Sequence, residues 1–284
     1  MKLAYYPGCS LDATAREYDQ SSRAVCRELG FDLQELEDWN CCGSSSAHNI
    51  NHVLAAALSA RNIALAQKAG VDITIPCAAC FARLRKADQI LQKGGKLKEE
   101  LEEMVNFKYT GTVGIISLLE AIVSRAGLES VGKKVKRPLN GLKVACYYGC
   151  LMVRPPEVRG FDRVENPMML DRLLEKLGAD VQQWSYKTDC CGASLSLTRA
   201  EVVEELVARL TGAAREAGAE AVVTACPLCQ SNLEMRQKGE NKLPSFYFTE
   251  LLGLAMGLPD AMQWMGRHIN NPSGLINRTV MTAQ

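Results

Sequence analysis

The chain reads DCCGA at residues 189–193, so Cys190 is followed directly by Cys191 and then by a glycine. Neighbouring Cα atoms lie about 3.8 Å apart across a trans peptide, whereas an ordinary disulfide needs a separation of roughly 4.4–6.8 Å. The two thiols are therefore poorly placed to pair with each other. The same pattern occurs earlier, as NCCGS at residues 40–44, so one explanation has to cover both stretches.

These stretches belong to an internal repeat. The segment LAYYPGC aligns with VACYYGC, CCGSS with CCGAS, and IPCAACF with TACPLCQ, in the same order. In both copies 34 residues separate the CC pair from a C-x-x-C pair, whereas the preceding gap is 31 residues in the first copy and 39 in the second. The extra residues are expected in a loop insertion, VRPPEVRGF. The repeated cysteines are Cys9, Cys41, Cys42, Cys77 and Cys80 in the first copy and Cys150, Cys190, Cys191, Cys226 and Cys229 in the second.

Size and charge limit the class of protein. A chain of 284 residues allows one large domain or two of about 140, and 47% apolar residues can form a hydrophobic core. The net charge of +1 argues against a general nucleic-acid binder. The N-terminus lacks a secretory signal pattern, and no apolar run approaches the roughly 18 residues of a membrane span. These features predict a cytoplasmic protein.

The segments between the cysteines alternate between strand and helix patterns. Residues 143–149 and 219–225 predict strands, while residues 16–30 and 198–218 carry helical periodicity. This alternation predicts an α/β fold with a small, mostly parallel sheet and flanking helices in each copy. Because each cysteine block follows a strand, we expect a cysteine cluster at the carboxyl edge of each sheet, where open α/β sheets place their sites.

A Lys- and Gly-rich stretch, VGKKVKRPLNG, separates the two copies. We therefore expect two tandem pseudo-symmetric domains. The first would span residues 1–138, including a helical extension and the linker, and the second residues 139–284. The charge run of the linker is expected to be solvated.

Twelve cysteines are unusual for a cytosolic chain, since that compartment keeps thiols reduced, so metal ligation or redox chemistry is the leading explanation. Zinc could use four of the five thiols in each copy, but it gives no reason to keep an adjacent pair twice. An iron–sulfur cluster holds several irons, so adjacent side chains that diverge can reach different metal atoms. In CPLC, Pro227 is expected at a first helical position, which places Cys226 at a helix N-terminus whose dipole lowers a thiol pKa.

The doubled C-x(n)-CCG-x(n)-C-x-x-C pattern resembles the CCG cysteine-rich domain, and its arrangement is similar to the B subunit of heterodisulfide reductase. The segments RPPEVRGFDRVENP, CPLCQSNLEMRQ and FYFTELLGLAMGL extend the resemblance over nearly the whole chain. The resemblance implies two non-cubane [4Fe-4S] clusters that act in catalysis. The implied ligands are Cys9, Cys41, Cys42, Cys77 and Cys80 for the first cluster and Cys150, Cys190, Cys191, Cys226 and Cys229 for the second.

The resemblance further implies a catalytic subunit that reduces a heterodisulfide, such as that of coenzyme M and coenzyme B, to two thiols. The implied partner subunits are one ferredoxin-like iron–sulfur protein and one flavin-containing protein, with a hydrogenase or formate dehydrogenase further upstream. Splitting a disulfide takes two electrons, whereas an ordinary cluster changes by one, which offers a hypothesis for the duplication. Two alternatives stay open: an electron-transfer subunit without disulfide chemistry, and a less favoured zinc-stabilised scaffold.

Several residues outside the repeated pattern are secondary candidates. Cys26 and Cys146 are predicted to be buried structural thiols. His48 follows the first CCG stretch and is a candidate proton donor to a leaving thiolate, although its counterpart in the second copy is Leu197. The remaining histidines, which we expect at the surface, are His52 and His268.

An anionic substrate would need cations near the thiols. The basic residues close to the cysteine stretches are Arg83, Arg85, Lys86, Arg154, Arg159 and Lys187. Because helix faces routinely carry such residues, each one alone is more simply explained as a solvated surface charge.

Overall fold

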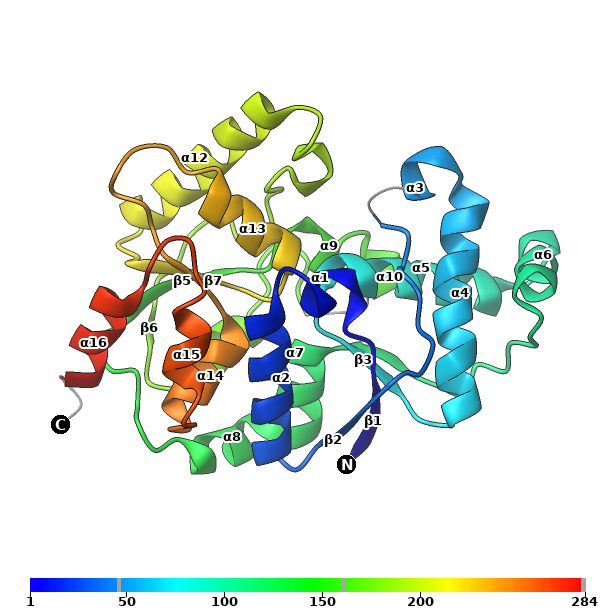
Figure 1. Cartoon of the computed structure of the whole chain (residues 1–284), viewed down its shortest axis with the longest axis horizontal. Coiled ribbons are helices and arrows are strands. Elements are labelled where there is room, and N and C mark those ends of the chain that lie inside the picture. Colours follow the sequence, from blue (N-terminus) through cyan, green and yellow to red (C-terminus); the bar gives the residue numbers. More distant parts are fainter. Residues whose placement is uncertain (45–46, 160–161, 282–284) are drawn as a thin grey trace.

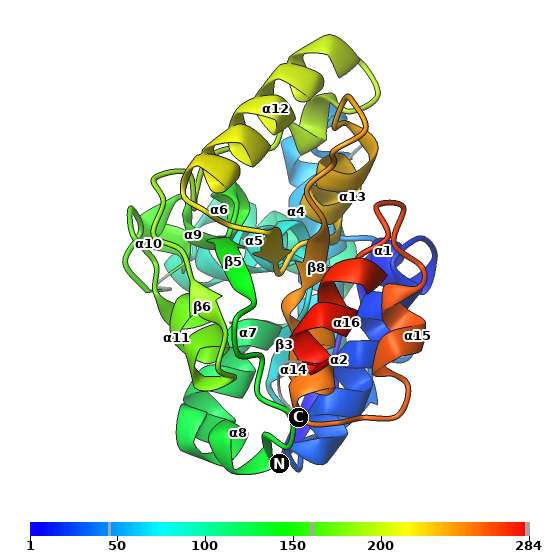
Figure 2. The same cartoon turned by 90° about the vertical axis from the view of Figure 1, so that its left-hand side faces the viewer.

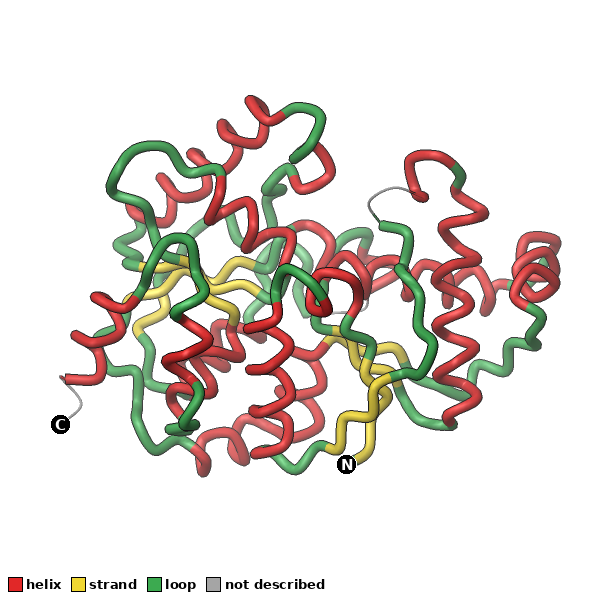
Figure 3. Tube along the Cα trace, viewed as in Figure 1, coloured by secondary structure: helices red, strands yellow, loops and turns green. Residues whose placement is uncertain are grey.

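The computed structural model describes residues 1–44, 47–159 and 162–281. Its strands form two separate sheets, one in each half of the sequence, which appear as two yellow groups in Figure 3. The strands of the first sheet are β1 (Lys2–Tyr5), β2 (Asp32–Glu35), β3 (Ile73–Ile75) and β4 (Ile115–Ser117). The strands of the second sheet are β5 (Lys143–Tyr147), β6 (Asp180–Val181), β7 (Ala221–Thr224) and β8 (Ser245–Tyr247).

The spatial order of the strands is β2-β1-β3-β4 in the first half and β6-β5-β7-β8 in the second. All neighbouring strands run parallel. β1 and β5 therefore occupy equivalent inner positions. The predicted α/β fold, with a parallel sheet and flanking helices in each half, is confirmed.

Helices connect the strands of the first half. They are α1 (Gly8–Asp12), α2 (Arg16–Glu28), α3 (Ala47–Ile50), α4 (His52–Ala69), α5 (Ala78–Lys93), α6 (Lys96–Val105), α7 (Leu118–Glu120) and α8 (Leu128–Lys134), with a π-helical segment (Ala121–Gly127) between the last two. The side chain of Asn51 accepts hydrogen bonds from Val53 N and Leu54 N and so caps α4, which ends at Gly70 in a left-handed conformation. Local sequence thus defines both ends of this helix.

The second half repeats the pattern with its own helices. They are α9 (Cys150–Val153), α10 (Pro156–Arg159), α11 (Met169–Lys176), α12 (Ala200–Glu216), α13 (Pro227–Met235), α14 (Phe248–Ala255), α15 (Ala261–Met265) and α16 (Ser273–Met281). The expected insertion contains α10, and its residues 160–161 lie outside the described residues. In Figures 1 and 2, α12 and α8 lie at opposite ends of the molecule. Across the described ranges, no helix combines the length and the apolar character required to cross a bilayer.

The repeat extends beyond the cysteines. β4 and β8 were not predicted, because strands of three residues carry too little alternation to be recognised. Each is followed at once by a helix whose third residue is a glutamate, Glu120 in α7 and Glu250 in α14. The first half inserts α6 before its fourth strand, which hides this match in the sequence.

The two halves pack closely against each other. Figure 1 places α2 of the first half next to α14 and α15 of the second, and α2 contacts both. Ser21 Oγ and Thr249 Oγ1 lie 2.7 Å apart, and the rings of Tyr18 and Tyr247 stack with centroids 4.1 Å apart. Buried apolar side chains of both halves form one continuous core. The domain boundary near residue 138 stays a prediction.

Candidate functional site

Three strands of each sheet are followed by cysteines at the carboxyl edge. In the first half Cys9 lies in α1 after β1, the CC pair follows β2, and Cys77 caps the N-terminus of α5 after β3. In the second half Cys150 begins α9 after β5, the CC pair follows β6, and Cys226 caps α13 after β7. Because these strands are neighbours in their sheets, the cysteine blocks of each half lie side by side at one edge.

The adjacent cysteines of the first half contact different partners. Cys41 Sγ accepts a hydrogen bond from Gly43 N at 3.4 Å, whereas Cys42 Sγ lies 3.3 Å from Cys80 Sγ. Gly43 has a φ of 77°, a left-handed conformation that glycine adopts without strain. The turn thus directs the two neighbouring thiols toward different partners.

The second half repeats this geometry. Gly192 N donates to Cys190 Sγ at 3.3 Å, and Cys191 Sγ lies 3.6 Å from Cys229 Sγ. Gly192 has a φ of 78°. All twelve cysteines of the chain are free thiols, so neither CC pair forms a strained vicinal disulfide.

A tyrosine holds each CC stretch in place. Tyr6 OH donates to Asn40 O at 2.8 Å, and Tyr147 OH donates to Asp189 O at 2.7 Å. In both halves the accepting carbonyl belongs to the residue directly before the CC pair. These tyrosines were not among the predicted site residues, although they occupy equivalent positions in LAYYPGC and VACYYGC and so could have been recognised.

A glycine before the first cysteine of each repeat allows close approach of the C-x-x-C thiol. A Cβ atom at Gly8 would lie 3.0 Å from Cys80 Sγ, and one at Gly149 would lie 3.0 Å from Cys229 Sγ. Both glycines also have positive φ values, of 72° and 69°. Any larger residue would therefore strain the backbone and displace a thiol.

The cysteines of each set differ strongly in pKa. Hydrogen bonds from the Cys42 and Cys9 thiols hold the pKa of Cys41 far below its usual range. A hydrogen bond from the Cys150 thiol lowers the pKa of Cys190 to about 6. The first cysteine of each CC pair is therefore a thiolate at neutral pH, and the thiolate is the form of cysteine that binds metal.

The two sets of thiols meet at the N-termini of α5 and α13. The thiols of Cys77 and Cys226 lie close enough to shift each other's pKa, upward for Cys77 and downward for Cys226. The thiols of Cys229 and Cys77, together with backbone N–H groups at the start of α13, lower the pKa of Cys226 well below its usual value. Pro227 occupies the first helical position, as predicted.

The hydroxyl of a buried tyrosine contacts the backbone directly before both Cys77 and Cys226. Tyr18 OH lies 3.1 Å from Pro76 O and 3.3 Å from Ala225 O, the carbonyls directly before Cys77 and Cys226. Tyr18 belongs to α2 and has no exposed surface. One side chain therefore sets the spacing of the two sets, through a contact between positions 207 residues apart.

Within the described ranges, no three or more His, Cys, Asp or Glu side chains gather around one point as ligands of a single metal ion do. The thiols of each set form close pairs instead, such as Cys42 with Cys80 and Cys191 with Cys229. Diverging thiolates and glycines that admit a bulky inorganic group are features that suit a cluster of several irons.

A cavity of about 460 Å³ opens onto the second set of thiols. All five cysteines of the second set line it, whereas no cysteine of the first set is among its lining residues in the described part of the chain. The first half also lines this cavity, with Ser44, His48, Asn49, Ala78, Ala79 and Arg83. Two residues predicted as candidates near the first set, His48 and Arg83, therefore share a cavity with the second set, while Arg83 also interacts with Cys42.

His48 is half-buried in the lining of this cavity. Burial, the charge of Arg83 and the neighbouring His52 lower its pKa. The imidazole is therefore neutral near pH 7. His52 is exposed, as predicted, and its ring centroid lies 5.1 Å from that of His48.

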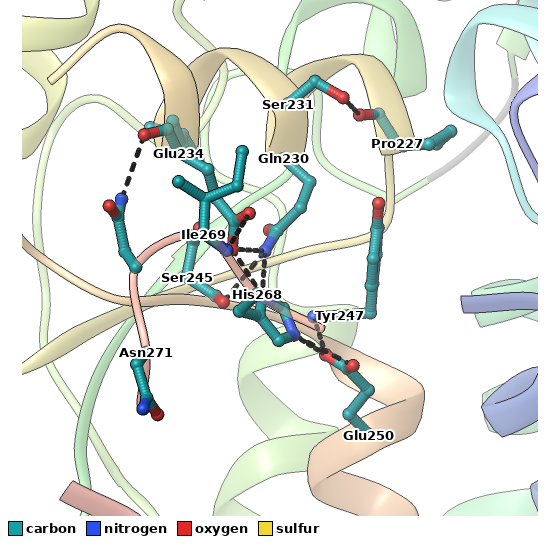
Figure 4. Close-up of polar contacts among 12 residues, drawn as sticks. Pro227, Gln230, Ser231, Glu234, Ser245, Tyr247, Glu250, His268, Ile269 and Asn271 are labelled. Carbon is teal, nitrogen blue, oxygen red and sulfur yellow. Dashed lines mark hydrogen bonds and ion pairs between the residues drawn. The ribbon is translucent and has the colours of Figure 1, made fainter. Parts of the chain in front are cut away.

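The prediction that His268 lies at the surface is wrong. Figure 4 shows its ring between Glu234 of α13 and Glu250 of α14, with Nε2 at 2.9 Å from Glu250 Oε1 and Nδ1 bonded to Glu234. Gln230, the residue after Cys229, donates to Glu234 Oε1 at 3.1 Å. Burial alone would lower the pKa of His268, but the two carboxylates outweigh it and raise the pKa to about 10. These side-chain contacts stabilise α13, the helix that begins at the second set of thiols.

This buried ion pair predicts a pH-dependent stability. The folded chain keeps the His268 proton up to about pH 10, whereas the unfolded chain loses it near its ordinary pKa of about 6.5. The contribution is thus fully present below about pH 6.5 and is lost as the pH rises to about 10. Urea unfolding across this window should show stability falling more steeply in the wild type than in His268→Gln, by up to about 1.4 kcal/mol per pH unit. Parallel curves for the two proteins would show that the proton is not held.

The prediction that Lys187 is a solvated charge is also wrong. Its ammonium is buried and lies 2.6 Å from Asp171 Oδ1, while Asp171 Oδ2 accepts a hydrogen bond from Tyr148 OH at 2.7 Å. Lys187 O also accepts hydrogen bonds from Tyr148 N and Gly149 N. The pair therefore fastens the segment before the second CC pair to the segment before Cys150.

The other candidate cations lie away from the cavity lining. Arg85 pairs with Asp88 at 3.4 Å, Lys86 is exposed, and Arg154 pairs with Glu165 at 2.8 Å. The side chain of Arg159 lies outside the described residues. Cys26 and Cys146 are buried, as predicted, and burial raises the pKa of both thiols, that of Cys26 to about 12.

Comparison with known proteins places both halves in one family. Residues 3–85 and 144–234 match the family described as the CCG cysteine-rich domain, and these regions contain all ten repeated cysteines. The chain is 32% identical to the 8-methylmenaquinol:fumarate reductase membrane anchor subunit of Wolinella succinogenes, over 91% of this chain and 93% of that protein. It is 27% identical to the B subunit of the ferredoxin/F420H2-dependent CoB-CoM heterodisulfide reductase of Methanosarcina acetivorans, over 92% of this chain and 91% of that protein.

A solved structure of a hypothetical protein from Helicobacter pylori has a similar fold. It matches with a TM-score of 0.73 at 14% identity and covers 95% of this chain. The match takes in 52% of that protein, so this chain spans about half of its length. At this level of identity the likeness concerns the fold alone.

Proposed function

Because this chain belongs to the CCG cysteine-rich domain family, we propose that it is the catalytic iron–sulfur subunit of an oxidoreductase complex that reduces a disulfide to two thiols. The observation that carries the proposal is the pair of equivalent five-thiol sets that approach each other at Cys77 and Cys226, with a cavity of about 460 Å³ beside one of them. Disulfide cleavage takes two electrons and two protons and leaves one proton on each sulfur. Two linked redox groups match that requirement.

Each set of thiols would hold one [4Fe-4S] cluster of the non-cubane type. The proposed ligands are Cys9, Cys41, Cys42, Cys77 and Cys80 in the first half and Cys150, Cys190, Cys191, Cys226 and Cys229 in the second. A bound cluster would exchange one electron at a time and offer iron to a sulfur ligand. The chain itself supplies the thiolates, the turns that keep neighbouring thiols apart, and the lining of the cavity beside the second set. His48, which lines the same cavity, would take up a proton from solvent and deliver it to a departing thiolate.

The electrons would come from other subunits. Relatives of this chain are named as subunits of larger enzymes, which supports a complex. The proposed partner subunits are one ferredoxin-like iron–sulfur protein and one flavin-containing protein, with a hydrogenase or formate dehydrogenase upstream. A second candidate function is electron relay without disulfide chemistry. It is favoured by a relative whose name refers to fumarate reduction and not to a disulfide.

Thiol titration separates the two functions. Oxidised, anaerobically purified protein should develop a paramagnetic signal in electron paramagnetic resonance (EPR) spectra when coenzyme M, coenzyme B or glutathione is added, because the proposed site accepts a thiolate sulfur. Protein loaded with iron but lacking the second CC pair serves as the control and should stay silent. Silence of the wild type with every thiol would favour relay.

A further inference from the structure

One buried tyrosine lies where the two sets of thiols approach each other. The Tyr18 hydroxyl lies 3.1 Å from Pro76 O and 3.3 Å from Ala225 O. These carbonyls directly precede Cys77 and Cys226, whose thiols shift each other's pKa. The hydroxyl therefore contacts the backbone of both sets at once, and the proposed disulfide chemistry assigns it no role.

This hydroxyl has one hydrogen to donate and two carbonyl acceptors within reach. Both distances exceed the value of about 2.7–2.8 Å that is typical of an O–H···O bond, so neither carbonyl binds the hydrogen tightly. Burial, followed by the charges of Cys226 and Cys77, raises the pKa of Tyr18 well above its usual range, and the hydroxyl keeps its hydrogen at neutral pH. The hydrogen can point toward either set but cannot make a full hydrogen bond to both.

The ring that carries the hydroxyl is held firmly. Tyr18 has no exposed surface, and its ring stacks on that of Tyr247 with centroids 4.1 Å apart and planes 4° from parallel. The ring of Phe248 meets it edge-on at 6.3 Å. The hydroxyl oxygen therefore stays in place, while the hydrogen can still turn about the C–O bond.

A turning hydroxyl responds to charge. Its hydrogen is the positive end of a dipole, so an electron added to either set of thiols would attract it. The attraction is stronger in the protein interior than in water, because the effective dielectric constant is lower there. Since one hydrogen cannot serve both sets, this stabilisation is available to the first added electron and not to the second.

We propose that Tyr18 is a redox-linked switch, whose hydroxyl hydrogen turns toward whichever set of thiols carries an added electron. The switch favours chains with one added electron over an equal mixture of chains with none and with two. A donor of single electrons can then load the protein in two separate steps. The hydroxyl keeps its proton throughout. This inference rests on the proposed function for a cluster in each set, and it does not depend on disulfide cleavage.

Tyr18→Phe removes the hydroxyl and keeps the stacked ring. In a redox titration of the anaerobically purified, cluster-bearing protein followed by EPR, the two one-electron steps should lie further apart in the wild type than in Tyr18→Phe. A tenfold loss of preference for the one-electron state, about the contribution of one hydrogen bond, would bring the steps closer by about 59 mV. Ser21→Ala is the matched control. It removes another buried contact between α2 and the second half, at 2.7 Å from Thr249 Oγ1, and should keep the wild-type separation.

Infrared difference spectra follow the hydroxyl itself. The reduced-minus-oxidised spectra of the wild type and of Ser21→Ala should contain a tyrosine C–O band that Tyr18→Phe lacks. If every thiol is silent in EPR while both readouts depend on Tyr18, the disulfide function fails and the switch stands. If thiols respond but Tyr18→Phe matches the wild type, or Ser21→Ala changes as much as Tyr18→Phe, the inference is overturned and the proposed function survives. A chain without a cluster in each set would overturn both.

Discussion

Replacing both cysteines of DCCGA by alanine is expected to halve the iron and acid-labile sulfide of the anaerobically purified protein. The variant Cys190→Ala/Cys191→Ala leaves the second set with three thiols, fewer than a four-ligand metal site needs. It also removes the thiolate whose pKa lies near 6 and the thiol that contacts Cys229. The first set, which keeps its own five thiols, should retain its cluster. Iron and sulfide analysis per chain measures the change directly.

Two further variants make this result specific. Cys26→Ala/Cys146→Ala removes the same number of thiols, both buried and outside the two sets, and should keep the full iron content. Cys41→Ala/Cys42→Ala should lower iron as much as the change in the second set, because the two halves share their geometry. An equal iron content of the DCCGA variant and the wild type would show that the second set of thiols does not bind metal.

Breaking the buried ion pair of Lys187 is expected to destabilise the folded chain strongly. Lys187 is 2% exposed and Asp171 is fully buried, with 2.6 Å between Nζ and Oδ1. Lys187→Met would leave the Asp171 carboxylate buried without its cation, which in comparable cases costs about 3–5 kcal/mol. The expected loss should appear as a lower midpoint of urea unfolding followed by circular dichroism.

A double variant tests the cause of that loss. Lys187→Met/Asp171→Leu removes both charges, although Tyr148 OH loses its bond to Asp171 and Pro167 O loses its bond from Lys187. Replacing both partners of a buried pair by apolar residues is often close to neutral, so the double variant should recover most of the lost stability. A double variant as unstable as the single one would attribute the effect to lost packing and not to an unpaired charge.

The placement of the cysteines could be predicted from sequence because it follows local rules. Each block follows a strand, and parallel neighbouring strands end at the same edge. A glycine follows each CC pair, and both Gly43 and Gly192 adopt a left-handed conformation that glycine accepts without strain. Pro227 marked the start of α13. These features need no knowledge of how distant segments pack.

The remaining features depend on distant contacts. His268 is buried because the chain returns over α13 and places the ring between Glu234 and Glu250, neither of which is near it in sequence. Lys187 is recognisable as a lysine before a CC pair, but its carboxylate partner lies on α11. The bridging role of Tyr18 requires both halves to be in contact. No periodicity or motif in one segment contains this information.

The cavity could not be predicted from the sequence either, because residues of both halves line it. The sequence revealed that His48 matches Leu197, and it placed Arg83 after the first C-x-x-C pair. It suggested a role for these residues at the first set of thiols. The structure places both in the lining of a cavity that they share with the second set, while Arg83 also interacts with Cys42 of the first set.

The most direct test of two thiolate-held clusters is the ratio of iron, acid-labile sulfide and zinc to protein after anaerobic purification of the full chain. Two [4Fe-4S] clusters predict about eight irons and about eight sulfides per chain, with little zinc. About two zinc ions per chain, with little iron or labile sulfide, would contradict the proposal and identify the two sets of thiols as structural zinc sites.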